Sequence, residues 1–79
     1  MSEYDEGKQA FVELVKGIDA AVEVVIPTIP SNSMFLISLT KSGNRKFLTV
    51  PEDDLLDLPS ESDIREKVTK DVRGAIGEL

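Results

Sequence analysis

The chain has 79 residues, a formal net charge of −6, and neither cysteine nor histidine. Without these two residue types, a nucleophilic triad, thiol chemistry and a metal site with nitrogen or sulfur ligands are all excluded. The length fits a single domain, residues 1–79, whose stability must come from packing because no disulfide can form.

The negative charge is concentrated between residues 51 and 63. This segment holds six acidic residues and no basic residue, whereas residues 18–50 and 64–79 each carry a small positive excess. An acidic surface repels phosphate backbones and gains nothing from counterion release. We therefore do not expect nucleic acid to be the main partner.

Residues 3–16 have the spacing of an amphipathic helix. Ser2 is the expected N-cap, and Gly17 is expected to follow the last turn in a left-handed conformation. The apolar stripe of this helix consists of Tyr4, Phe11, Leu14, Val15 and Ile18.

Residues 20–26 alternate as a half-buried strand does. Glu23 is expected to face water, and the prolines and polar residues from Pro27 to Ser33 predict a loop. The core-facing side chains of this strand are expected to be Ala20, Val22, Val24 and Ile26.

The stretch from Met34 to Val50 predicts a β-hairpin. A two-residue turn at Gly43-Asn44 would place Leu39 opposite Leu48, and Ile37 opposite Val50. The core face would then hold Phe35, Ile37, Leu39, Leu48 and Val50. The opposite face would hold Met34, Leu36, Ser38, Thr40, Phe47 and Thr49.

Two helices are expected after the hairpin. The first is short and acidic, begins at a Thr49–Glu52 capping box and ends before Pro59. The second begins at a Ser60–Asp63 capping box and runs to about Ile76. Its apolar stripe consists of Ile64, Val68, Val72, Ala75, Ile76 and Leu79.

These elements predict an α+β fold of the order α-β-β-β-α-α. A three-stranded antiparallel meander would form one layer of a two-layer sandwich. The two long helices, one at the N-terminus and one at the C-terminus, would cover its apolar face, and the short acidic helix would lie between the hairpin and the last helix. The other face would stay open.

Two surfaces are candidates for function. The open face would carry a possible protein interface made of Val25, Met34, Leu36 and Phe47, because exposed apolar patches often mark interfaces. A possible acidic surface consists of Glu52, Asp53, Asp54 and Asp57. A charged first turn of a solvated helix explains these acids without chemistry. We expect no catalytic residue, cofactor or metal, and therefore no enzyme.

The sequence favours a non-catalytic protein-interaction or regulatory module. Its partner would be another protein, or a second copy in a weak homodimer. One alternative is a nucleic-acid-binding module that uses the hairpin tip of Lys41, Arg45 and Lys46; another is an acidic inhibitor that mimics DNA. The acidic N-terminus, the absence of a long apolar run and the absence of cysteine favour the cytoplasm.

Overall fold

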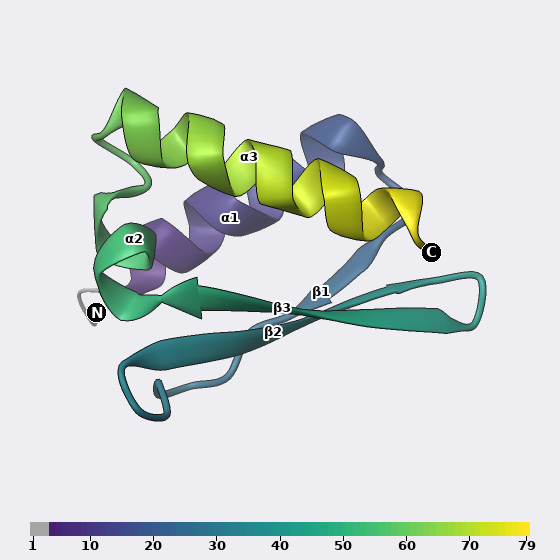
Figure 1. The fold of residues 1–79 in the computed structure, drawn as a ribbon, viewed down its shortest axis with the longest axis horizontal. Coiled ribbons are helices and arrows are strands. Elements are labelled where there is room, and N and C mark those ends of the chain that lie inside the picture. Colours follow the sequence, from purple (N-terminus) through teal and green to yellow (C-terminus); the bar gives the residue numbers. More distant parts are fainter. Residues whose placement is uncertain (1–3) are drawn as a thin grey trace.

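The computed structural model describes residues 4–79, and its elements follow the expected order α-β-β-β-α-α. Figure 1 shows the three helices on one side of a three-stranded sheet, whose other side is left open. The elements are α1 (Tyr4–Ile18), β1 (Glu23–Val25), β2 (Met34–Lys41), β3 (Asn44–Pro51), α2 (Glu52–Asp57) and α3 (Ser62–Gly77).

The sheet is an antiparallel meander in the order β1-β2-β3. Its inner face and the helices enclose one apolar core, to which β2 contributes Phe35, Ile37 and Leu39, all fully buried. Leu36 and Phe47 lie on the open face and are each 54% exposed. The predicted separation of the two faces is therefore confirmed. Within residues 4–79, no helix has the length and apolar character needed to cross a membrane.

The predicted hairpin register is wrong by two residues. The turn lies at Ser42-Gly43, where both residues have positive φ (52° and 81°), so it is of type I′ rather than II′. Ile37 is consequently opposite Leu48, and Leu39 is opposite Lys46. The register expected from Gly43-Asn44 would have placed Lys41 directly opposite Lys46, and like charges at opposed positions destabilise a sheet.

The first strand is shorter than predicted. It covers Glu23–Val25, and the chain before it forms a turn in which the Asp19 carboxylate accepts a hydrogen bond from the backbone N–H of Ala21 (3.0 Å). Ala20 is therefore exposed instead of joining the core, whereas Val22 is fully buried as expected.

The predicted end of the first helix is also wrong. Gly17 lies inside α1, which ends one residue later at Ile18. The N-cap proposed at Ser2 lies outside the described residues.

Neither predicted capping box forms. Thr49 belongs to β3, and α2 follows Pro51 directly while the N–H of Glu52 donates to the carbonyl of Ser33 (2.9 Å). Ser60 bonds back to the carbonyl of Asp57 through its backbone N–H (3.0 Å), and α3 begins two residues after it. The Ser60 hydroxyl donates to the carbonyl of Asp57 (3.4 Å) instead of capping α3, and strand pairing removes Thr49 from α2 altogether.

The helices α1 and α2 approach each other very closely at Gly7. A β-carbon at this position would overlap the carbonyl oxygen of Leu55 and would lie 2.9 Å from its carbonyl carbon. Nearby, the Tyr4 ring meets the ring of Phe35 edge-on at 5.2 Å, and its hydroxyl donates to the Glu52 carboxylate (3.0 Å). The missing side chain of Gly7 is what allows α1 to pack against the main chain of α2.

Candidate functional site: the open face of the sheet

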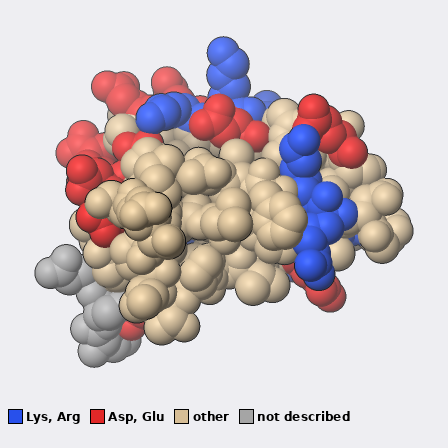
Figure 2. Space-filling model, turned by 60° about the horizontal axis from the view of Figure 1, so that its bottom comes forward, with Lys and Arg blue, Asp and Glu red and all other residues tan. Residues whose placement is uncertain are grey.

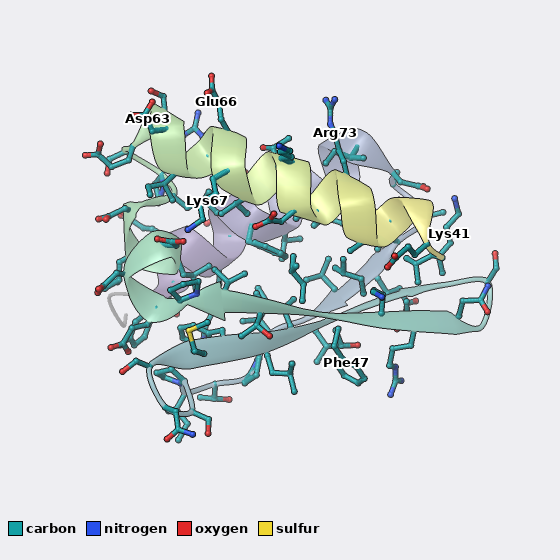
Figure 3. All side chains as sticks on the ribbon, in the orientation of Figure 1. Lys41, Phe47, Asp63, Glu66, Lys67 and Arg73 are labelled. Carbon is teal, nitrogen blue, oxygen red and sulfur yellow. The ribbon has the colours of Figure 1, made fainter. Side chains whose placement is uncertain are left out.

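The open face of the sheet carries three of the four residues predicted for an interface. Val25 is 62% exposed, and Leu36 and Phe47 are each 54% exposed, whereas Met34 is half-buried and lines a pocket with Asp54 and Lys67 of the helices. Phe47 projects away from the helices in Figure 3. In Figure 2 this side of the molecule is a wide uncharged surface, crossed by a band of basic side chains toward the end at which the hairpin turn lies. Val25, Leu36 and Phe47 of the sequence-predicted interface are thus brought together.

The pairing of the strands explains why these side chains are neighbours. Val25 is opposite Ser38, and Ser38 is opposite Phe47, so the three form one row across the sheet. Leu36 lies opposite Thr49 in the next row. Small hydroxyl side chains therefore separate larger apolar ones, and a partner can contact the phenyl ring and the aliphatic groups from one side.

The four predicted acidic residues do not form one cluster. The Glu52 carboxylate accepts the hydrogen bond from Tyr4, while Asp54 makes an ion pair with Lys67 of α3 (2.8 Å). Asp53 and Asp57 are exposed. Across residues 4–79, no group of three or more acidic side chains is arranged to hold a metal ion. Two of the four acids of α2 thus make separate structural contacts, and the other two face solvent.

The basic hairpin tip is divided between the two faces of the sheet. Lys41 pairs with Asp19 at the end of α1, and Lys46 pairs with Glu78 at the end of α3. Figure 3 shows Lys41 extending toward the helices, opposite to Phe47. Arg45 lies opposite Thr40 and shares the open face with Phe47. Among residues 4–79, the tip therefore presents Arg45 to the open face without an ion pair, while Lys41 and Lys46 are paired.

Two features of the surface were not predicted from the sequence. Ile29, in the loop between β1 and β2, is 74% exposed, which makes it more exposed than any predicted interface residue. A shallow hollow also runs along the outer side of α3, lined by Arg65, Glu66, Thr69, Lys70 and Arg73. The i, i+4 spacing of Arg65, Thr69 and Arg73 is the sequence signal for this hollow.

Protein-family models, curated proteins and solved structures gave no match to this chain. Any function must therefore be argued from the surfaces themselves. The open face offers exposed apolar side chains on a sheet whose other face is buried in the core.

Two ion pairs shift the ionisation of their members. The hydrogen bond from Lys41 lowers the pKa of Asp19 below its ordinary 3.8, and the N–H of Ala21 adds to this effect. The hydrogen bond to Asp54 raises the pKa of Lys67 above its ordinary 10.5. Both shifts favour the charged forms of Asp19 and Lys67.

The Asp19 carboxylate is expected to stabilise the fold at neutral pH and to lose that contribution in acid. Its pKa is lower in the folded than in the unfolded chain, so the contribution is complete above 3.8 and disappears as the pH falls through the folded value. Asp19→Asn should therefore lower the urea midpoint by a constant amount above about pH 5, and by progressively less in stronger acid.

Urea unfolding of both proteins over a pH series measures this difference. Asp53→Asn, which removes an exposed carboxylate of α2, is the matched control and should reproduce the wild-type pH profile. Midpoints of Asp19→Asn that stay parallel to those of the wild type down to the lowest pH would contradict the expected role of Asp19.

Proposed function

We propose that this protein is a non-catalytic interaction module that binds a protein partner through the open face of its sheet. The observation that carries the proposal is the group of Val25, Leu36 and Phe47, each more than half exposed on adjacent strands. Burial of such side chains contributes about 1.5–3 kcal/mol each. Aromatic side chains at the centre of a patch commonly dominate binding energy.

The alternatives have less support. Nucleic-acid binding at the hairpin tip would require Lys41 and Lys46 to leave their ion pairs with Asp19 and Glu78. A DNA mimic requires a continuous acidic surface, whereas basic side chains line the outer side of α3. We place this interaction or regulatory module in the cytoplasm, because a chain without cysteine forms no disulfide and fits a reducing compartment.

Site-specific photo-crosslinking tests the proposal. A photoreactive amino acid is placed at Leu36, in the middle of the open face, or at Arg73, whose side chain points away from the sheet in Figure 3. In irradiated cells we expect a covalent protein adduct from position 36 and only background from position 73. Phe47→Ser should reduce the adduct at least about tenfold, because it removes the central aromatic side chain.

The stability of each variant is checked by urea unfolding, since only folded protein is informative. Equal adducts from both positions, or none from position 36, would contradict an interface on the open face. An adduct twice the mass of the chain identifies a second copy, and any other mass identifies a different protein.

A further inference from the structure

The charges on the open face have an ordered placement. The register groups its side chains into rows that run across the strands. From the turn end these rows are Glu23–Thr40–Arg45, then Val25–Ser38–Phe47, then Leu36–Thr49, then Met34–Pro51. Within these rows Glu23 and Arg45 are the charged residues, and they occupy opposite edges of the same row.

Neither charge is neutralised within the described part of the chain. The ion pairs of residues 4–79 join other residues, and two strand spacings, about 10 Å, separate the backbones of Glu23 and Arg45. The open face thus presents an acid at the β1 edge and a base at the β3 edge, with apolar groups in the rows beyond them. A partner for this face must offer a base and an acid in the mirrored order.

We propose that the partner is a second copy of this chain, related by a two-fold axis that runs along β2. This proposal rests on the proposed function of the open face. Such an axis exchanges the β1 and β3 edges and keeps every row at the same level. Glu23 of one copy then lies over Arg45 of the other, twice by symmetry, and Val25 lies over Phe47 in the same way. Leu36 and Ser38 sit near the axis and meet their own counterparts.

A two-fold axis across the strands is disfavoured. It would reverse the order of the rows and bring Arg45 over the apolar end near Pro51, where a charge loses its hydration without gaining a partner. Aligned sheets pack with strands about 30° apart, so the favoured axis lies about 15° from β2. The long side chains of Glu23 and Arg45 accommodate this rotation.

The size of the face predicts a weak dimer. Two strands of eight residues and one of three, spaced about 4.8 Å apart, cover about 300 Å² per copy. Stable interfaces bury about 800 Å² per partner. We therefore expect a dissociation constant of about 0.1–1 mM, in the range of transient self-association.

Charge reversal tests both the partner and the axis. Glu23→Arg and Arg45→Glu each place like charges face to face at both ends of the interface, and each should weaken self-association at least about tenfold. The double variant restores opposite charges and keeps the net charge of −6, so its association should return to within about threefold of the wild type. Sedimentation equilibrium up to millimolar concentration measures all four proteins.

The matched controls are Glu66→Arg and Arg73→Glu, which change the net charge equally but point away from the sheet (Figure 3). Their association should stay within about twofold of the wild type. If the wild-type chain remains monomeric at millimolar concentration, the proposed homodimer is wrong, while a crosslink from position 36 to another protein would still support the interaction module. If the wild type dimerises but the double variant does not regain its association, the two-fold axis along β2 is wrong.

Discussion

Truncation of Phe35 to alanine is expected to lower the free energy of unfolding by about 3–5 kcal/mol, which is a large share of the stability of a small domain. Phe35 is fully buried in the middle of the core face. Its ring meets Tyr4 edge-on, and the ammonium group of Lys8 lies 5.7 Å from its centroid. The substitution therefore opens a cavity and also loosens the N-terminal turn of α1.

Phe47→Ala is the matched control for Phe35. It removes the same side chain from the neighbouring strand, but on the open face, where the ring is 54% exposed. Its cost should be below about 1 kcal/mol, as for other surface substitutions. Urea unfolding of the two variants at low protein concentration compares the two faces directly. Equal losses at both positions would contradict the division of the sheet into a core face and an open face.

Gly7→Ala is expected to destabilise the protein by about 3 kcal/mol, although alanine is normally preferred to glycine in a helix. The new β-carbon would overlap the Leu55 carbonyl group, and because this obstacle is main chain, no rotamer change relieves it. The helices α1 and α2 must separate, which exposes apolar groups beneath them. Thermal and urea unfolding measure the loss.

Gly74→Ala is the matched control and is expected to change the stability in the opposite direction. Gly74 lies inside α3, and a β-carbon there would have no atom within 4 Å. This substitution should raise stability by about 0.5–1 kcal/mol through the ordinary preference for alanine in helices. If Gly7→Ala were as stable as Gly74→Ala, the close approach between α1 and α2 would be wrong.

Alternation of apolar residues was sufficient to predict which side chains of the hairpin face the core. It could not distinguish the two registers, because a shift of two residues in the pairing leaves every side chain on the same face. Turn chemistry was ambiguous as well, since Gly43 can be the first residue of a turn at Gly43-Asn44 or the second residue of a turn at Ser42-Gly43. The opposition of Lys41 and Lys46 in the expected register was the signal that favoured the alternative.

The candidate interface was predictable for the same reason as the core. Val25, Leu36 and Phe47 are apolar residues at positions that alternate with buried ones. The alignment of Glu23 with Arg45 was not predictable, because it depends on the register of both strand pairs at once. The starts of the last two helices were predicted wrongly because Thr49 pairs within the sheet and Ser60 bonds back to Asp57. The spacing of a capping box takes no account of such competing partners.

The contacts of α1 impose an order on how the chain folds. Tyr4 bonds to Glu52, 48 positions away, and Gly7 packs against Leu55, whereas a two-residue turn joins β2 to β3. Closing a short loop costs less entropy than closing a long one, so the hairpin precedes the docking of α1. The apolar stripe of α1 therefore stays uncovered until the later part of the chain, with Glu52 and Leu55, is present to receive it.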